Sequence, residues 1–202
     1  WYNLGPTEVQ QEAGAELIVN INASPYHAGK QESREQVLAS RAIANELLVS
    51  YTNMVGGQDE LVFDGASLVV DATGQAIVNV QEFVETVAIV DVQKSSSGLE
   101  FDGPNDKLIT DAENVYSALV VGVRDYLTKN NFPGAVLGLS GGIDSALTFA
   151  IAVDAVGADK VRAISMPSRY TAQMSIDDAL EQARRLGCDC DVIPIGQPFD
   201  SF

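Results

Sequence analysis

Two adjacent glycines in the stretch 137–147, which reads LGLSGGIDSAL, constrain the fold of this chain more than any other feature. The apolar residues 134–137 directly before them are typical of a short buried strand. Residues 144–156 after them are almost wholly apolar and long enough to form a buried helix. The sequence therefore predicts a strand, a glycine-rich turn and a helix, in this order.

This turn has the properties of a phosphate-binding site. A turn at the start of a helix directs several backbone N–H groups and the positive end of the helix dipole at one point. Gly141 and Gly142 lack a Cβ atom, so the backbone can bend sharply and approach a ligand closely. Ser140 and Ser145 add hydroxyl donors. The carboxylate of Asp144 beside an anion site is explained if Mg²⁺ lies between it and phosphate oxygens.

Other motifs with glycine-rich turns fit less well. No Gly-Lys-Ser/Thr follows at the spacing of a P-loop, and the G-x-G-x-x-G of dinucleotide-binding folds is missing. The residues 138–142 do match the G-x-S-x-G nucleophile elbow of hydrolases. That elbow needs an acid and then a histidine later in the chain, whereas the single histidine, His27, comes earlier. A purely structural glycine turn is the remaining alternative.

From residue 111 onward, helices alternate with short apolar strands. The expected strands are 134–137, 160–166 and 190–195, and the expected helices begin at 111, 144 and 175. Helices between consecutive strands predict a parallel, doubly wound sheet, in which ligands bind beyond the carboxyl ends of the strands. The turn at Ser140 and the stretch 166–169, with Arg169 as a candidate phosphate contact, should thus face one ligand. Ser175 and Asp178 resemble a capping box at a helix start.

The first part of the chain has a different pattern. Residues 17–22 predict a strand with a polar exit at 22–25, and residues 32–48 predict an amphipathic helix. Short strands and turns follow, of which 86–92 is the clearest strand. Residues 93–106 are polar, without a period, and predict a linker. We therefore expect domains at 1–92 and 111–202, joined by a linker at 93–110, with both ends of the chain lying inside domains.

Charge and composition exclude several classes of protein. The chain has 12 Lys and Arg residues against 28 Asp and Glu, a formal net charge of −16, which disfavours a nucleic-acid surface. No apolar run reaches the length of a membrane span. The two cysteines, Cys188 and Cys190, are too few for a disulfide framework, and a zinc site is disfavoured. This usage suits a cytoplasmic protein.

The run SGGIDS at 140–145 resembles the pyrophosphate loop of the N-type ATP pyrophosphatases. These enzymes activate a carboxyl or carbonyl oxygen with AMP and release pyrophosphate. The resemblance implies that Asp144 ligates Mg²⁺ and that eight residues bind the nucleotide: Gly138, Leu139, Ser140, Gly141, Gly142, Ile143, Asp144 and Ser145.

Two stretches in the first part narrow the resemblance. NASP at 22–25, followed by Lys30 and Arg34, and the stretch 51–65 are similar to the carboxyl half of the nitrilase-like glutaminase domain of the glutamine-dependent NAD synthetase family. Met54 departs from the family, which usually has Gln there. The resemblance implies an α/β fold: a partial nitrilase-like α-β-β-α domain, then the start of a doubly wound parallel-sheet domain of the adenine nucleotide alpha hydrolase-like type.

In that family a cysteine thiolate, helped by a glutamate and a lysine, releases ammonia from glutamine. ATP and Mg²⁺ adenylate the carboxylate of nicotinic acid adenine dinucleotide, and ammonia displaces AMP to give NAD. Ser24 and Lys30 match the family's glutamine-binding positions. The family's nucleophile precedes the residue that matches Trp1, and its Glu and Lys lie further upstream. We therefore expect no glutaminase catalytic residue within this chain, and we expect a homo-oligomer.

Three other functions remain open from the sequence. The chain could come from another N-type ATP pyrophosphatase, such as a tRNA-modifying enzyme, which the acidic charge disfavours. It could be a nucleotide-binding module without catalysis. An amidase with an unrelated partner domain would leave the loop at Ser140 unexplained.

Overall fold

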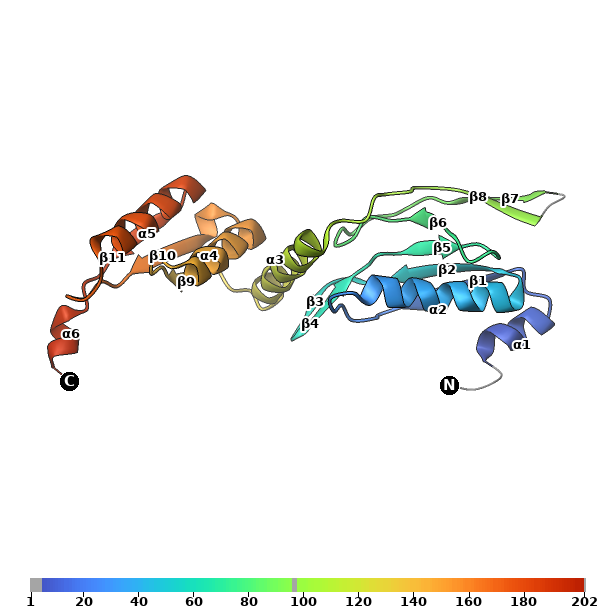
Figure 1. Ribbon diagram of the computed structural model, residues 1–202, viewed down its shortest axis with the longest axis horizontal. Helices are drawn as coiled ribbons and strands as arrows, with labels where there is room; N and C mark the ends of the chain where they lie inside the picture. The colour runs from blue at the N-terminus through green and yellow to red at the C-terminus, as the bar shows by residue number, and fades with distance from the viewer. Residues whose placement is uncertain (1–4, 96–97, 202) are drawn as a thin grey trace. The chain divides into compact units, whose positions relative to one another are not determined.

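The computed structural model describes residues 5–95 and 98–201, and the chain divides into two compact units (Figure 1). The first unit comprises residues 1–56 and 60–118, and the second comprises residues 57–59 and 119–202. Both units combine helices and strands, as the sequence predicts for an α/β protein.

The first unit is built on a four-stranded sheet. Its elements are α1 (Pro6–Glu12), β1 (Leu17–Asn22), α2 (Lys30–Asn45), β2 (Leu48–Asn53), β5 (Leu68–Val70) and β6 (Ala76–Asn79). The strand order is β1-β2-β5-β6, with β1 parallel to β2 and the other neighbours antiparallel. Two hairpins accompany the sheet, one of β3 (Val55–Gln58) and β4 (Leu61–Asp64), the other of β7 (Asp91–Ser95) and β8 (Gly98–Asp102).

The long helix α2 lies along this sheet (Figure 1). Its buried residues recur every three or four positions, which places them on one face of the helix. Leu38 and Ala42 from this face pack with Val49, Leu68 and Val70 of the strands. The same stripe also contains a charged residue, Arg34, which is 6% exposed. A buried charge requires a partner, and this partner belongs to the site described below.

The second unit is a parallel α/β sheet. Its elements are α3 (Asp111–Lys129), which begins in the first unit, then β9 (Ala135–Gly138), α4 (Ile143–Val156), a 3₁₀ turn η1 (Ala158–Lys160), β10 (Val161–Ser165), α5 (Gln173–Leu186), β11 (Asp189–Val192) and α6 (Gly196–Asp200). The strand order is β11-β10-β9, and both pairings are parallel. The predicted parallel sheet is therefore confirmed.

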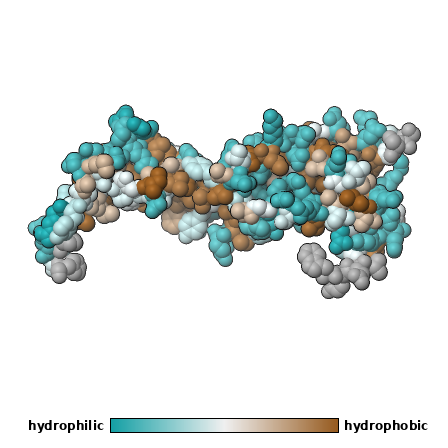
Figure 2. Space-filling model, viewed as in Figure 1, coloured by the Kyte–Doolittle hydropathy of each residue, from teal (hydrophilic) through white to brown (hydrophobic). Residues whose placement is uncertain are grey.

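The core of the second unit lies between the sheet and two helices. Phe149 and Ala152 of α4, with Ala179 and Ala183 of α5, pack against the strand residue Ala163. The exposed faces of the two helices differ in hydropathy. In Figure 2 the surface of α5 is teal, in line with the exposed ion pairs of Glu181. Brown surface lies over the region of α4 in Figure 2. Ile143 of α4 and Val136 of β9 are both exposed.

Three local predictions differ from the structure. The strand expected at 86–92 is wrong, since strand geometry begins only at Asp91 and Val87 is 91% exposed. The β7–β8 hairpin overlaps the expected linker, since its strands pair from Asp91–Asp102 to Ser95–Gly98. Ser175 does not cap α5: that helix begins at Gln173, because a turn closed by the Thr171 N–H and the Ser168 carbonyl already redirects the chain.

Candidate functional site

The glycine-rich turn lies beyond the carboxyl end of β9. Leu139 follows this strand, is 1% exposed, and donates its N–H to the Ile164 carbonyl of β10 at 2.9 Å. Gly142 has extended dihedrals and caps α4, which begins at Ile143. The predicted order of strand, turn and helix is therefore confirmed, and the turn is fixed to the sheet on one side and to the helix on the other.

Two serine hydroxyls hold the shape of this turn. Ser145 Oγ accepts the N–H of Ser140 at 3.2 Å, donates to the Gly142 carbonyl at 2.9 Å, and lies 3.0 Å from Ser140 Oγ. Ser140 Oγ in turn accepts the Gly142 N–H at 3.3 Å. Within the described residues, no acid or histidine contacts either hydroxyl. The contacts of both serines are thus with the loop itself, as expected for residues that hold its shape.

Gly141 is required by backbone conformation and by space. Its φ is +81°, in the left-handed region that side chains with a Cβ rarely adopt. A Cβ at this position would lie 2.2 Å from the carbonyl oxygen of Ser175 in the first turn of α5. The glycine thus lets the loop and the start of α5 pack directly on each other.

Several amides of the loop remain available to a ligand. Among the described residues, the N–H groups of Gly141, Ile143 and Asp144 have no hydrogen-bond partner. Backbone N–H groups in the first turn of a helix, together with the helix dipole, favour an anion. All three residues are either half-buried or exposed, so an anion can reach them from solvent.

Asp144 is the candidate Mg²⁺ ligand. Its side chain is exposed in the first turn of α4, beside these amides. No group of three or more His, Cys, Asp or Glu residues in the described part of the chain could hold a metal. Mg²⁺ bound to a nucleotide needs only one or two carboxylates, because phosphate oxygens and water fill its other positions. A single exposed carboxylate beside an anion site therefore fits Mg²⁺ bound with phosphates, and does not fit a site made of protein ligands alone.

The end of β10 lies beside the end of β9, and Arg169 has a partner of its own. A Cβ on Gly138 would lie 3.4 Å from the Met166 side chain, so the ends of β9 and β10 are in contact. Arg169 forms an ion pair with Asp200 of α6 at 3.1 Å. The phosphate contact expected of Arg169 is not tested by the structure and stays a prediction.

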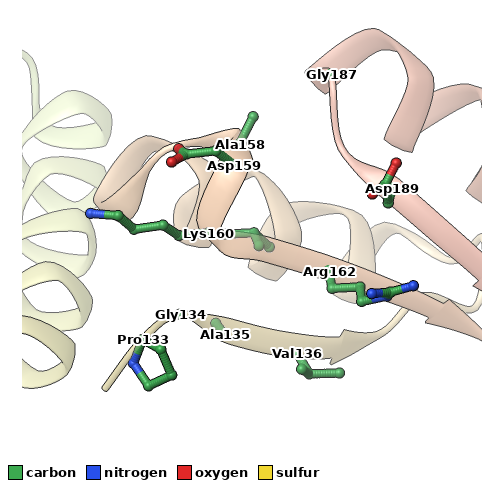
Figure 3. Close-up of a pocket in the computed structure, with 11 residues that line it drawn as sticks. Pro133, Gly134, Ala135, Val136, Ala158, Asp159, Lys160, Arg162, Gly187 and Asp189 are labelled. Atoms are coloured by element: carbon green, nitrogen blue, oxygen red, sulfur yellow. The ribbon is translucent and has the colours of Figure 1, made fainter. Parts of the chain in front are cut away.

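A large hollow lies at the other end of this sheet. It has a volume of about 560 Å³ and is lined by the amino ends of β9, β10 and β11 together with η1 (Figure 3). Lys160 and Arg162 point away from each other in it, and Arg162 is bound to Asp191 at 2.6 Å. Ligands of parallel α/β sheets bind beyond the carboxyl ends of the strands, so this hollow is not the candidate nucleotide site.

The first unit carries the predicted glutamine-binding residues on either side of one loop. Ser24 follows β1, and its N–H donates to Asn53 Oδ1 at 2.8 Å. Lys30 is the first residue of α2 and lines a pocket of about 300 Å³. Ser24 is not among the residues that line this pocket. The two residues therefore flank the same loop, but only Lys30 lines the pocket.

The pocket beside Lys30 has acidic walls. Burial raises the pKa of Glu82, and hydrogen bonds from the Ile109 N–H at 3.1 Å and the Asn114 amide at 2.6 Å only partly offset this effect. The hydroxyl of Tyr26 is buried without a hydrogen-bond partner within the described residues. Burial first, and then the neighbouring carboxylates, raise the pKa of Tyr26. This pocket thus combines a lysine with acidic side chains and a tyrosine whose hydroxyl is buried.

A buried polar network extends from this pocket, and no sequence motif assigns it a role. Arg34 binds the Asp64 carboxylate through two hydrogen bonds, and Asp64 accepts a third from the Asn53 amide at 3.2 Å. All three side chains belong to buried residues. The network could have been predicted from the position of Arg34 on the buried stripe of α2, four residues before Leu38. A charge on an apolar helix face requires a buried partner.

Comparisons with known proteins agree with both halves of the chain. The family model described as carbon-nitrogen hydrolase matches residues 9–99, and the one described as NAD synthase matches residues 115–202. No helix among the described residues is long and apolar enough to cross a membrane.

Full-length relatives match across both halves. The glutamine-dependent NAD⁺ synthetase of Rhodobacter capsulatus is 46% identical over 188 residues, which is 92% of this chain and 34% of that protein. The enzyme of the same name from Aquifex aeolicus is 38% identical, over 100% of this chain and 41% of its own length. The chain thus spans between a third and about two fifths of these relatives.

A solved structure shows the same fold. The glutamine-dependent NAD⁺ synthetase of Acinetobacter baumannii, in complex with ADP, superposes with a TM-score of 0.91 at 39% identity. The superposition covers 96% of this chain and 37% of that one. The domain boundaries at 92 and 111 stay predictions, as do the individual site residues.

Proposed function

The chain belongs to the glutamine-dependent NAD⁺ synthetase family, and from this premise we propose that the protein containing it makes NAD⁺ from nicotinic acid adenine dinucleotide, ATP and glutamine. In this proposal the second unit activates the dinucleotide with ATP, and the first unit takes part in releasing ammonia from glutamine. The family name describes the overall reaction, and the loop geometry supports the assignment of its ATP-dependent step to residues 138–145.

The free amides of the loop carry this proposal. The N–H groups of Gly141, Ile143 and Asp144 are unpaired within the described residues and stand at the start of α4. We assign them to the β- and γ-phosphates of ATP, where they stabilise the charge that develops on departing pyrophosphate. Support comes from the Acinetobacter baumannii relative, whose structure contains ADP.

Asp144 would hold Mg²⁺ at the same place. The ion would supply charge neutralisation for the phosphate oxygens. The protein's own part is to keep the carboxylate at the first turn of α4 and the loop closed around the phosphates. Ser140 and Ser145 keep that loop in shape through their mutual hydrogen bonds.

In the first unit, Ser24 and Lys30 are assigned to glutamine. The Lys30 ammonium would pair with the substrate carboxylate, and it lines a pocket large enough for part of an amino acid. The thiolate that attacks the amide is assigned to a part of the protein outside this chain. Ammonia would then reach the activated dinucleotide and displace AMP.

The fate of one oxygen atom tests the ATP-dependent step. The whole protein is given ATP, Mg²⁺, ammonium and dinucleotide labelled with ¹⁸O in its carboxylate. If the carboxylate attacks the α-phosphate, one ¹⁸O atom appears in AMP, and pyrophosphate is released in equal amount to NAD⁺. Formation of ADP and labelled inorganic phosphate would contradict adenylation. Glutamine in place of ammonium then tests the first unit, with glutamate release as the readout.

A further inference from the structure

One buried amide holds the main chain of Ser24 on both sides. The Ser24 N–H donates to Asn53 Oδ1 at 2.8 Å, and Asn53 Nδ2 donates to the Ser24 carbonyl at 3.2 Å. Asn53 is the last residue of β2 and is 7% exposed. The position of Ser24, on the loop after β1, therefore depends on how the Asn53 side chain is oriented.

Asp64 helps to set that orientation. Asn53 Nδ2 donates its second hydrogen to Asp64 Oδ1 at 3.2 Å. A carboxylate only accepts hydrogen bonds, so the amide must turn its NH₂ group toward Asp64 and its oxygen toward the Ser24 N–H. A reversed amide would place oxygen against carboxylate and NH₂ against N–H. In a buried site both contacts are unfavourable, so Asp64 reinforces the orientation that the Ser24 N–H and carbonyl also require.

Arg34 completes the arrangement on the far side of Asp64. Its Nη1 and Nη2 atoms donate to the two carboxylate oxygens at 3.1 and 3.0 Å, which fixes the plane of the carboxylate. Asp64 is 1% exposed and also lines the pocket that Lys30 lines. One carboxylate therefore lines the pocket of Lys30 and also contacts the amide that holds Ser24.

We propose that Asp64 is a positioning residue for the glutamine site: by orienting the Asn53 amide, it fixes the Ser24 main chain and hence the direction of the Ser24 hydroxyl. This inference rests on the proposed function of Ser24. Asp64 does not touch the substrate in this role. Its effect is to pre-organise the loop, so that glutamine binding does not have to order it.

Three variants of the whole protein separate positioning from general stability. Asp64→Asn keeps the size of the side chain but removes the charge that Arg34 binds and one acceptor oxygen, so it weakens the hold on the Asn53 amide. It also destabilises the buried pair, so its free energy of unfolding is measured beside the kinetics. Asn53→Ala removes both bonds to Ser24 and leaves the Arg34–Asp64 pair intact. Ser67→Ala is the matched control. Ser67 Oγ accepts the backbone N–H of Asn53 at 3.0 Å and has no hydrogen bond to the side-chain amide of Asn53.

Two readouts are taken from each variant. For Asp64→Asn and Asn53→Ala we expect the KM for glutamine to rise about tenfold, as for the loss of a buried hydrogen-bond pair. NAD⁺ formation from ammonium should stay within roughly twofold of the unsubstituted protein, because it does not use this site. Hydrogen exchange at the Ser24 amide should accelerate in the same two variants. Ser67→Ala should leave both glutamine KM and Ser24 exchange nearly unchanged.

The outcomes separate this inference from the proposed function. Unchanged glutamine KM in Asp64→Asn and Asn53→Ala, with normal turnover of the unsubstituted protein, would overturn the positioning role alone. Equal effects of Ser67→Ala would also overturn it, since any lost hydrogen bond near Asn53 would then suffice. If the unsubstituted protein does not hydrolyse glutamine, the proposed function fails first, and the positioning role falls with it.

Discussion

Arg34 and Asp64 form a two-point ion pair inside the first unit, with Nη1 to Oδ2 at 3.1 Å and Nη2 to Oδ1 at 3.0 Å. Only 4% and 1% of their side chains are exposed. The guanidinium also lies over the Tyr51 ring, 5.4 Å from its centre. The pair thus joins the helix α2 to the end of β4 at a place where neither charge can be satisfied by water.

Replacing Arg34 by Met should destabilise the protein strongly. Met keeps the apolar stem but leaves the Asp64 carboxylate buried without its cationic partner, which costs about 3–5 kcal/mol of unfolding free energy. Arg41→Met is the matched control, since Arg41 pairs with Glu8 on a partly exposed surface and its loss should cost less than about 1 kcal/mol. Urea unfolding of the whole protein measures both values. Equal losses for the two variants would contradict the buried-pair interpretation.

Gly141→Ala should abolish tight nucleotide binding. The positive φ alone costs an alanine about 1–2 kcal/mol, and the clash with the Ser175 carbonyl adds to this by displacing the loop. We expect ATP affinity to fall by more than about tenfold in equilibrium binding. Gly14→Ala is the control, because Gly14 also has a positive φ but no atom lies near its Cβ position. Undiminished ATP binding by Gly141→Ala would remove the loop from the nucleotide site.

Asp144→Asn should lower the affinity of the site for Mg²⁺ more than its affinity for ATP. Asparagine keeps the size of the side chain but not the charge that attracts a divalent cation. We expect the Mg²⁺ concentration that gives half-maximal pyrophosphate release to rise about tenfold, with a smaller effect on ATP binding in chelator. Asp177→Asn on the exposed part of α5 is the matched control. Identical Mg²⁺ curves for the two variants would argue against Asp144 as a ligand.

The shape of the glycine-rich loop could be predicted from the sequence because its motif is local. Gly141 and Gly142, two serines and one acid lie within six residues, and the hydrogen bonds between Ser140, Gly142 and Ser145 are all local. The parallel sheet could also be predicted, because apolar strands alternate with helices along the sequence. The order of strand, turn and helix could therefore be predicted before the geometry was known, while the roles of the loop residues stay predictions.

The first-unit pocket could not be predicted in this way. Tyr26 and Glu82 lie 56 positions apart, and only the tertiary fold brings both to the pocket that Lys30 lines. The strand expected at 86–92 failed for a related reason. Its residues have high β-propensity, but a strand also needs a neighbour, and residues 86–90 pair with none of the described strands. Ser175 has the side chain of a capping residue, but α5 already begins at Gln173, because the preceding turn redirects the chain earlier.

Asp71 should make the first unit sensitive to acid. Burial acts to raise the pKa of Asp71, but hydrogen bonds from the Thr73 hydroxyl and from the backbone N–H groups of Gln75 and Thr73 hold it below its usual value. A lowered pKa in the folded state contributes stability that is present above the pKa of the unfolded chain. This contribution is lost as the pH falls through the folded pKa.

Comparison with Asp71→Asn isolates this contribution. The stability advantage of the unsubstituted protein over the variant should be largest near about pH 6 and shrink steadily toward about pH 3, because asparagine does not titrate. Urea midpoints across this range measure the difference. An advantage that stays constant or grows on acidification would show that the carboxylate is not stabilised as the hydrogen bonds indicate.

Ser140→Ala distinguishes a phosphate loop from a nucleophile elbow. Ser140 Oγ accepts the Gly142 N–H and lies 3.0 Å from Ser145 Oγ, so its removal should loosen the loop and reduce kcat/KM for ATP by about tenfold. A serine nucleophile would lose about a millionfold in kcat on the same change. Ser145→Ala should be at least as damaging, because Ser145 bonds both Ser140 and Gly142. Steady-state kinetics of the two variants, with mass spectrometry of the whole protein after turnover, decide between the two roles. A covalent ester on Ser140 would contradict the assignment of the loop to ATP.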